Sequence, residues 1–399
     1  MSGAPTPRTP LPPGSTLGVM GGGQLGRMFA HAAQVLGYPV LVLDPDAASP
    51  AGAVAQAQIQ APYDDAAALA RMADRAAAVT TEFENVPAPA LATLAARVPV
   101  APAAEAVAIC QDRAEEKAHF ARAGVPCAPH AVIDSPAALA AVADDLLPGI
   151  LKTARLGYDG KGQVVVADRA ALAAAWDDLK RVRCVLEKKL PLALELSVIV
   201  ARGADGAVVN LPVQQNLHRG GILALTTVPA ARADDALAAR AVERARAIAV
   251  SMRYVGVLCV EFFVLADGGL VANEMAPRPH NSGHYSIDAC DLSQFELQVR
   301  TLAGLPLVEP RLHSPCEMVN LLGDLWFEPG AAADAAPREP AWAQLLALPG
   351  MHLHLYGKTQ ARRGRKMGHL TITAATPQAA RDLANAAAAL LGLPAFGPL

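Results

Sequence analysis

The sequence predicts a chain of mixed α/β and α+β structure: an open parallel α/β domain, a larger central unit and a small β-rich C-terminal domain. Three observations predict this order. A strand–helix–strand pattern with G-x-G-x-x-G at its first turn lies at 17–44. A glycine-rich loop at 157–163 separates two strand-like runs. An Asp-Gly hairpin signal lies between two apolar runs at 267–268.

The bulk composition limits the classes of protein. The 399 residues allow two or three domains, each with its own core. Hydrophobic residues make up 53%, but no apolar run reaches the ~18 residues of a membrane-spanning helix. The net charge of −3 argues against a protein that coats nucleic acid. The six cysteines are scattered and form no C-x-x-C motif, which indicates a reducing, cytoplasmic setting. We therefore expect no membrane and no nucleic-acid partner.

The first domain is expected at 16–112. Residues 1–15 are rich in Pro, Ser and Gly and lack an apolar core, which predicts a disordered leader. A strand at 17–20, a helix from 27 to about 36 and a strand at 40–43 follow. A capped helix ending near 75 and a strand at 78–81 complete the predicted sheet.

The central unit is expected at 113–305, with a glycine-loop subdomain at about 113–186 and a larger subdomain at about 187–305. Its predicted elements are a helix at 114–123, strands near 150–152 and 164–166, a helix at 169–179, strands at 184–186 and 196–200, and a helix near 294–303. The C-terminal domain, 306–399, is predicted to hold short strands at 318–322, 352–356 and 369–373, and a helix at 377–391.

Two glutamates in the hairpin carry the strongest chemical signal. With Asp267-Gly268 as a two-residue turn, counting outward places Glu261 opposite Glu274. Opposed side chains have Cβ atoms about 4.5–5.5 Å apart. Carboxylates that close repel each other unless a proton or a cation lies between them. A hard cation such as Mg²⁺ prefers such oxygen ligands together with nucleotide phosphates. The alternative is two solvated strand-end glutamates, since a one-residue shift in the turn breaks the pairing.

The loop from Gly157 to Gln163 has three glycines in six residues, so backbone N–H groups can approach phosphate oxygens. Lys161 in the loop and Lys152 on the incoming strand add positive charge. The alternative is an ordinary flexible hairpin tip. The segment 187–190, which follows a strand, could offer backbone groups to a purine.

Three further motifs remain open on the residues alone. The G-x-G-x-x-G at 21–26, with Asp44 eighteen residues beyond it, is typical of NAD binding, or of a helix N-terminus that holds another phosphate. His280-x-x-x-His284 has a zinc-like spacing but lies in a Pro-rich, non-helical segment, which argues against zinc. The basic run 362–366 is either a solvated loop or, with Lys358, a phosphate site.

Together these motifs resemble the ATP-grasp superfamily and, within it, the carboxyaminoimidazole ribonucleotide synthase family. The motifs are GGGQLGRM, TTEFENVP, GYDGKGQ, QNLHRGGIL, NEMAPRPHNSGH and GRKMGHL, which occur in this order over about residues 16–395. The resemblance implies an ATP-grasp fold preceded by a Rossmann-like domain. It also implies a homodimeric enzyme of purine biosynthesis. This enzyme would use ATP, bicarbonate and aminoimidazole ribonucleotide, pass through carboxyphosphate and release ADP and phosphate.

The resemblance also implies roles for individual residues. ATP would contact Arg113, Lys152, Gly157, Tyr158, Asp159, Gly160, Lys161, Gly162, Gln163, Glu187, Lys188, Leu190, Glu195, His218, Asn273 and Glu274. Mg²⁺, or Mn²⁺ in its place, would bind Glu261 and Glu274. The ribonucleotide would contact Gly22, Gln24, Leu25, Glu82, Glu84, Arg278, His280, Asn281, Ser282, Lys358, Arg365 and Lys366. The catalytic residues would be Tyr158, Asp159, Arg278 and Lys358. No NAD, biotin or zinc is expected as a cofactor.

Two rival interpretations deserve comparison. The formate-dependent glycinamide ribonucleotide transformylase, another ATP-grasp enzyme, typically has a G-x-G-E-L-G-K-like first loop, whereas Gln24 and Arg27 here favour the carboxylating enzyme. An NAD oxidoreductase would leave the second glycine loop and the glutamate pair unexplained. If Lys358, Arg365 and Lys366 bind the ribonucleotide phosphate, the C-terminal segment must fold back over the first domain, near residues 22–25.

Overall fold

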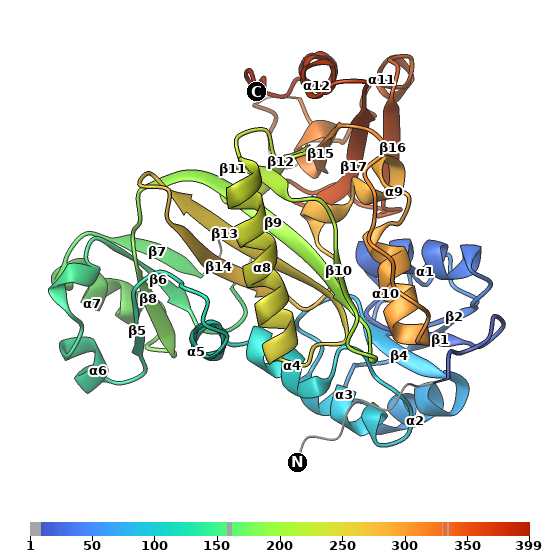
Figure 1. Ribbon diagram of the computed structural model, residues 1–399, viewed down its shortest axis with the longest axis horizontal. Coiled ribbons are helices and arrows are strands. Elements are labelled where there is room, and N and C mark those ends of the chain that lie inside the picture. The colour runs from blue at the N-terminus through green and yellow to red at the C-terminus, as the bar shows by residue number, and fades with distance from the viewer. Residues whose placement is uncertain (1–8, 158–161, 329, 333–334) are drawn as a thin grey trace.

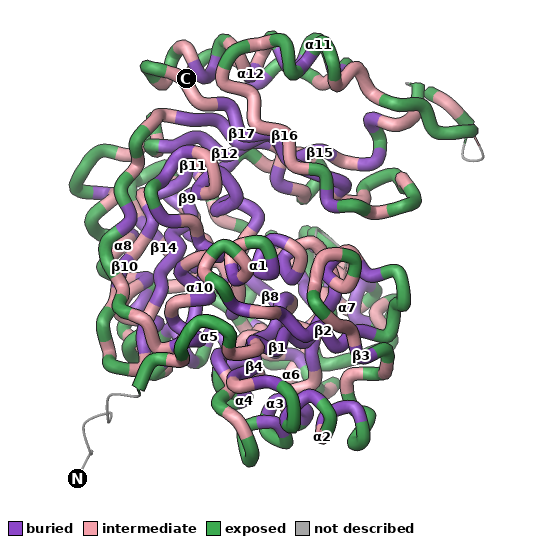
Figure 2. The backbone as a smooth tube through the Cα atoms, turned by 90° about the vertical axis from the view of Figure 1, so that its right-hand side faces the viewer, coloured by how far each residue is buried: buried purple, intermediate pink, exposed green. Residues whose placement is uncertain are grey.

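The computed structural model describes residues 9–157, 162–328, 330–332 and 335–399. These described residues form three β-sheets with helices packed against them (Figure 1). Buried residues are concentrated in the strands and along the inner faces of the helices (Figure 2). Within the described residues, no helix is both long and apolar enough to cross a membrane.

The N-terminal sheet is parallel, with the strand order β3-β2-β1-β4. Every residue of β1, β2 and β4 is buried, as expected for parallel strands that helices cover on both faces. The strands are β1 Leu17–Met20, β2 Val40–Asp44, β3 Ala57–Gln60 and β4 Ala78–Thr81, and the helices are α1 Gln24–Val35, α2 Ala66–Arg75, α3 Ala88–Ala95 and α4 Ala104–Cys110. Helix α10 of the central unit, Gln294–Ala303, packs beside α1 on this sheet.

The segment that precedes β1 is docked on this domain. The backbone N–H of Leu11 donates to the Ala303 carbonyl at 2.8 Å, and its carbonyl accepts from the Tyr38 hydroxyl at 2.7 Å. Gly14 N donates to Gly37 O at 2.8 Å. The prediction of a disordered leader is therefore wrong for residues 11–14, while residues 1–8 lie outside the described part of the chain. Proline-rich composition opposes helices and strands, but an extended segment can still dock through its backbone groups.

A small antiparallel sheet follows, with the order β5-β8-β6-β7. Its elements are α5 Arg113–Arg122, β5 His130–Ile133, α6 Pro136–Ala140, the 3₁₀ turn η1 Asp144–Leu146, β6 Gly149–Thr153, β7 Gln163–Val166, α7 Arg169–Asp178 and β8 Cys184–Lys188. Strands β6 and β7 form the hairpin whose tip is the glycine loop, and residues 158–161 of this tip lie outside the described part.

The large sheet has the order β14-β13-β9-β11-β12-β15-β17-β16, and β10 pairs with β9. Its strands are β9 Leu192–Arg202, β10 Val208–Asn210, β11 Gln214–Arg219, β12 Ile222–Val228, β13 Gly256–Leu265, β14 Leu270–Ala276, β15 Cys316–Leu322, β16 Met351–Leu355 and β17 Lys366–Thr373. The remaining elements are α8 Asp235–Ser251, η2 Asn281–Gly283, α9 Ser286–Ala289, η3 Gly323–Trp326, α11 Trp342–Leu346 and α12 Pro377–Leu391.

Helix α8 covers one face of this sheet, and α9 and α10 pack on the other (Figure 1). The C-terminal strands continue the same sheet, because β15 pairs antiparallel with β12 and places Val319 opposite Leu225. The C-terminal segment thus shares backbone hydrogen bonds with the central unit, which fixes its position relative to the cleft described below.

The hairpin of β13 and β14 places Glu261 opposite Glu274, as predicted, but by a different route. Leu265 N donates to Gly269 O at 2.7 Å, so the loop has three residues and ends in Gly268 with φ +83°. That one-residue difference is cancelled by a β-bulge, because Phe262 pairs with Ala272 and the residue between Ala272 and Glu274 has no partner. The bulged residue is Asn273, which lines the site.

A buried ion pair joins the C-terminal helix to the large sheet. Arg381 of α12 donates to Glu317 of β15 at 2.8 Å and to the Thr227 hydroxyl of β12 at 2.9 Å. The side chains of Arg381 and Glu317 are 5% and 0% exposed. Burial raises the pKa of Glu317 to about 7 although Arg381 opposes this shift. Removing one partner of such a pair leaves a buried charge uncompensated.

We therefore expect Arg381→Met to lower the free energy of unfolding by about 3–5 kcal/mol, measured by urea denaturation. The matched control is Arg97→Met, since Arg97 pairs with Asp74 and both side chains are about half exposed. Such a pair contributes at most about 1 kcal/mol. Equal losses in the two variants would contradict the assignment of Arg381 as a tie between α12 and the sheet.

Candidate active site

A cleft of about 410 Å³ lies where the three sheets meet. The small sheet contributes one wall, β13 and β14 contribute the floor, and residues that follow β4 contribute the end. The predicted site residues that line it are Glu84, Arg113, Lys152, Gly157, Gln163, Glu187, Lys188, Leu190, Glu195, His218, Glu261, Asn273, Glu274, Arg278, His280, Asn281 and Lys366.

Glu261 and Glu274 lie on the floor of the cleft, and different groups hold the two carboxylates. Arg113 donates to Glu274 Oε2 at 2.9 Å, and His280 Nε2 lies 3.1 Å from Glu261 Oε1. Burial and the charge of Glu274 raise the pKa of Glu261 to about 8. Burial also opposes ionisation of Glu274, but Arg113 outweighs it and lowers the pKa of that carboxyl. The pair therefore has too little positive charge beside it for both groups to ionise readily.

The bulged Asn273 supplies a third oxygen. Its side-chain Oδ1 is buried and has no hydrogen-bond partner among the described residues. An orphaned acceptor is costly unless a donor or a cation satisfies it. Two carboxylates and an amide oxygen, all hard ligands, match the donor set that Mg²⁺ prefers. The residues present therefore fit a divalent hard cation.

Two lysines and one glutamate form a buried cationic group beside the floor. Lys117 and Lys152 each place Nζ 2.9 Å from a different oxygen of Glu187. Burial would raise the pKa of Glu187, but Lys152 and Lys117 outweigh it and hold the pKa at about 2. With two cations and one anion, the group carries a net charge of about +1 at neutral pH. Such a charge in a partly dry cleft attracts phosphate.

The sequence analysis missed Lys117. It lies in α5, where RAEEKAHF reads as an ordinary charged helix, and its side chain is 1% exposed. A signal for Lys117 was available in the helical periodicity. It places this lysine on the same face as Ala114 and Phe120, which are also buried, and a buried lysine indicates a charged partner.

A second pair lies on the neighbouring strands. His218 Nδ1 of β11 is 2.6 Å from Glu195 Oε2 of β9. Burial lowers the pKa of His218, but the hydrogen bond to Glu195 and the charge of Glu261 raise it overall. The apolar side chains that line the cleft include Ile150, Leu192, Phe263 and Met275. An apolar slot beside a strand edge suits the flat face of a base.

At the end of the cleft, Arg278 donates to Glu84. Burial would raise the pKa of Glu84, but Arg278 outweighs it and lowers the pKa to about 2. Asn281 lines the cleft, and both polar atoms of its side-chain amide are buried without a partner in the described part of the chain. A donor and an acceptor left open in a cleft are suited to recognising a polar ligand.

The G-x-G-x-x-G turn lies near this end, outside the residues that line the cleft. Asp44 accepts from Gly22 N at 2.6 Å and from the Tyr63 hydroxyl at 2.6 Å. The use of Asp44 inside the protein disfavours the NAD interpretation, in which this acid should meet a ribose. Glu82 accepts from Gly23 N and Gly26 N, at 3.1 and 3.2 Å.

The first two helical N–H groups, those of Gln24 and Leu25, donate to no acceptor among the described residues. They remain suited to an anion. Two residues predicted to contact the substrate, Glu82 and Ser282, make hydrogen bonds inside the protein. Glu82 is buried and holds the loop. Ser282 is also fully buried, and its hydroxyl lies 2.8 Å from Ser197 Oγ and 2.9 Å from His280 Nδ1, which positions that imidazole.

The C-terminal segment packs on the first domain at Tyr356, and the convergence of its basic side chains near residues 22–25 stays a prediction. Tyr356 packs in the same core as α1, and Lys358 follows it. The Lys358 ammonium donates to Lys366 O at 2.6 Å, and Lys366 lines the cleft. Burial and the charge of Arg365 lower the pKa of Lys358 to about 8, although the nearby Glu82 opposes this shift.

Four predicted site residues, Tyr158, Asp159, Gly160 and Lys161, lie outside the described residues. The flanking Gly157 and Gln163 line the cleft, whereas Gly162 does not. Gly162 has φ +72°, a conformation that favours glycine. Strand β7 begins at the next residue, Gln163.

Comparison with known proteins identifies the class of this cleft. Residues 15–111 match the ribonucleotide synthetase preATP-grasp domain, 118–295 the ATP-grasp domain, and 316–383 the phosphoribosylaminoimidazole carboxylase C-terminal domain. The N5-carboxyaminoimidazole ribonucleotide synthase of Brucella melitensis is 45% identical over 371 residues, which cover 91% of this chain and 98% of the relative. The chain belongs to the N5-carboxyaminoimidazole ribonucleotide synthase family. It is an ATP-grasp ligase, and the predicted fold class and resemblance are confirmed.

Solved structures of the same family have the same fold. The Staphylococcus aureus synthetase in complex with ADP is 36% identical, with a TM-score of 0.85 over 95% of this chain and 98% of that one. The Aspergillus clavatus synthase in complex with ADP and 5-aminoimidazole ribonucleotide is 33% identical, with a TM-score of 0.85 over 95% and 99% of the two chains. The ligands named here are bound by those two proteins.

The group of Lys117, Lys152 and Glu187 leads to a prediction about ATP binding by a Lys117 variant. Lys117→Met reduces the net charge of the group from about +1 to 0, so the dissociation constant for ATP should rise about tenfold or more. Titration calorimetry measures it. Arg122→Met, on the exposed end of the same helix, is the control and should leave ATP affinity unchanged. Equal affinities for the Lys117 variant and the wild type would show that this group does not attract phosphate.

Proposed function

We propose that the chain carboxylates the exocyclic amine of aminoimidazole ribonucleotide, using ATP and bicarbonate, in purine biosynthesis. One observation supports the proposal: a single cleft is lined by oxygen ligands and cations suited to a nucleoside triphosphate and also by Arg278, Asn281 and Lys366. The domain boundaries and the cytoplasmic location, inferred from the sequence, and the homodimer and Mn²⁺ in place of Mg²⁺, implied by the resemblance, stay predictions.

The nucleotide half of the cleft would hold ATP by three means. The apolar slot beside β8 takes the base, and Glu195 with His218 can bond the ribose hydroxyls. Lys152 and Lys117 attract the phosphates, and Arg113 lies beside Glu274 at the phosphate end. Mg²⁺ held by Glu261, Glu274 and Asn273 would neutralise charge on the phosphate oxygens. Closely placed cations lower the barrier because negative charge shifts during phosphoryl transfer.

The reaction would proceed in two displacements. A bicarbonate oxygen attacks the γ-phosphorus, and ADP leaves, which gives carboxyphosphate. The exocyclic amine nitrogen of the ribonucleotide then attacks the carboxyl carbon. This carbon is either still part of carboxyphosphate or part of CO₂ that carboxyphosphate has released in the cleft. Phosphate leaves with the oxygen that bridged carbon and phosphorus, and the nitrogen loses a proton. Because water would destroy carboxyphosphate, both substrates must be bound in one shielded cleft.

The ribonucleotide half would use the groups near α1. Its 5′-phosphate would accept from Gln24 N and Leu25 N at the start of the helix, where the helix dipole also favours an anion. Lys358, Arg365 and Lys366 would supply the charge-assisted contacts. Asn281 would bond the imidazole portion, and Arg278, fixed by Glu84, would lie between this portion and the carboxyl donor.

The direct test of this function measures ADP release from ATP in the presence of Mg²⁺, with each of two sets of substrates. Release at full rate should require both bicarbonate and aminoimidazole ribonucleotide. Formate with glycinamide ribonucleotide, the set of the rival transformylase, should give no turnover. Turnover with the second set in place of the first would replace this proposal with the rival.

We expect Glu274→Gln to abolish Mg²⁺-dependent ADP release while the thermal melting curve stays near that of the wild type. The substitution removes one anionic oxygen from the cation site and the partner of Arg113, but it keeps the shape of the side chain. Glu243→Gln, an exposed position on α8, is the control and should retain full activity. Normal turnover by the Glu274 variant at ordinary Mg²⁺ would remove this residue from the metal site.

Lys358 gives a pH prediction. Its lowered pKa of about 8 means that the ammonium is charged below pH 8 and loses its proton as the pH rises through that value. The KM for the ribonucleotide should therefore rise between about pH 7 and pH 9, while the KM for ATP changes little. Lys358→Arg, whose charge persists, should flatten the profile. A parallel rise in the two KM values, or an unchanged slope in the variant, would place the phosphate elsewhere.

A further inference from the structure

Strand β14 lies at one end of the large sheet, so only one of its two edges pairs with another described strand. The strand on that side is β13, and the bulge at Asn273 interrupts the pairing beside Glu274. A bulge leaves one residue unpaired and bends the strand, so nearby backbone groups need partners from elsewhere. Two of the three side chains that fit a cation belong to this bent stretch. The position of its backbone therefore decides where their oxygens lie.

Helix α5 and the segment that follows it cover the other edge of β14. They make one contact to each of four consecutive residues, 272–275. The contacts are Pro126 O with Ala272 N at 2.8 Å, Lys117 Nζ with Asn273 O at 3.5 Å, Arg113 with Glu274 Oε2 at 2.9 Å and Glu116 Oε1 with Met275 N at 2.6 Å. The Glu116 contact is the shortest of the four, and this residue is only 3% exposed. Side chains of α5 thus take the place of a neighbouring strand.

Glu116 lines the cleft but has no part in the reaction described above. It follows Arg113 by three positions in α5, so the two side chains lie on the same face of the helix. The Met275 N–H that it accepts is a backbone donor in a buried residue, and such a donor is costly without an acceptor. If Glu116 lost its oxygen, this N–H would have to turn toward water. The shift would carry the preceding residue, Glu274, with it.

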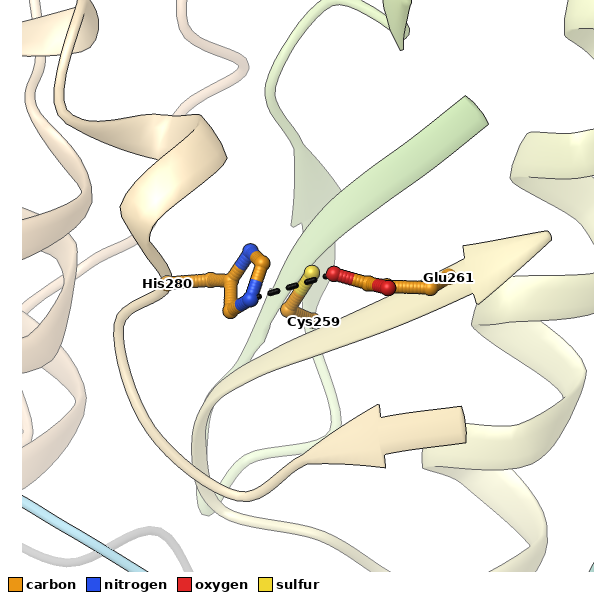
Figure 3. A group of neighbouring side chains, drawn as sticks. All are labelled: Cys259, Glu261 and His280. Atoms are coloured by element: carbon orange, nitrogen blue, oxygen red, sulfur yellow. Dashed lines mark ion pairs between the residues drawn. The ribbon is translucent and has the colours of Figure 1, made fainter. Parts of the chain in front are cut away.

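The second carboxylate of the pair is held independently of α5. Glu261 lies on β13, and His280 Nε2 lies 3.1 Å from its Oε1 (Figure 3). Strand β13 pairs on both of its edges, with β14 and with β9, so its backbone has strand neighbours on either side. A change at Glu116 should therefore displace the oxygens on β14 and leave Glu261 in place.

We propose that Glu116 is a positioning residue for the cation site. By accepting the Met275 N–H, it fixes the bulge of β14 and thereby sets where the oxygens of Asn273 and Glu274 lie. Glu116 itself touches neither the cation nor a substrate. This role rests on the Mg²⁺ site of the proposed function, but it requires neither bicarbonate nor the ribonucleotide.

The test measures the dissociation constant for ATP by calorimetry, once with Mg²⁺ and once with EDTA, on the full-length protein without other substrates. The ratio of the EDTA constant to the Mg²⁺ constant reports how much the metal contributes to binding. Glu116→Gln keeps an acceptor oxygen at the same reach and should keep the wild-type ratio. Glu116→Met has a similar length but no acceptor, and it should lower the ratio about fivefold or more. The constant in EDTA should be the same in these two variants, which have the same charge.

Glu116→Asp separates charge from reach and keeps the test open if the Met variant does not fold. It retains the carboxylate but is one methylene shorter, so its ratio should fall as in Glu116→Met. The matched control is Glu115→Met, because Glu115 is exposed on the same helix and lies 3.5 Å from Arg183. This control should leave both constants unchanged.

Equal losses in the Gln and Met variants would overturn the proposal, because charge and not the acceptor would then matter. An unchanged ratio in the Met and Asp variants would overturn it too, as would a wild type whose ATP affinity is the same with and without Mg²⁺. Normal Mg²⁺-dependent ATP binding by the wild type, without ADP release from bicarbonate and the ribonucleotide, would count against the proposed function alone.

Discussion

The opposed carboxylates of Glu261 and Glu274 are the constraint around which the cleft is arranged. Antiparallel pairing of β13 and β14 brings them together, and burial raises the cost of their charge. Arg113 compensates one carboxylate from α5, and His280 contacts the other from the loop after β14. The hairpin, helix α5 and the loop after β14 are distant in sequence, and their charged side chains meet at this point. A bound cation would compensate the remaining negative charge of the two carboxylates.

The same principle extends outward from this pair. Lys117 and Lys152 tie α5 and β6 to Glu187 on β8, and Arg278 ties the end of β14 to Glu84 in the first domain. Each contact connects separate elements across the cleft and leaves positive charge or hydrogen-bonding groups facing it. The continuous pairing from β12 through β15 to β17 then places Lys366 among the residues that line the cleft. Shape and charge of the cleft therefore arise from the same set of contacts.

The sequence analysis located most of the lining residues because chemically distinctive motifs carry them. Helix and strand positions followed from hydrophobic periodicity, as for β1 and α12. The Glu261–Glu274 pairing was found through two errors that cancel, a turn one residue too short and an unforeseen bulge at Asn273. Bulges have no reliable sequence signal. Lys117 and the docking of Leu11 were missed because their partners, Glu187 and Ala303, are distant in the chain.

In the proposed reaction, one cleft transfers the γ-phosphoryl group of ATP to bicarbonate and then passes the carboxyl group to an amine. Oxygen-18 in bicarbonate tests it most directly. The bridging oxygen of carboxyphosphate comes from bicarbonate and leaves with phosphate. The released phosphate should therefore carry one labelled oxygen per turnover when aminoimidazole ribonucleotide is present. Phosphate that takes its new oxygen only from water would rule out carboxyphosphate as the intermediate.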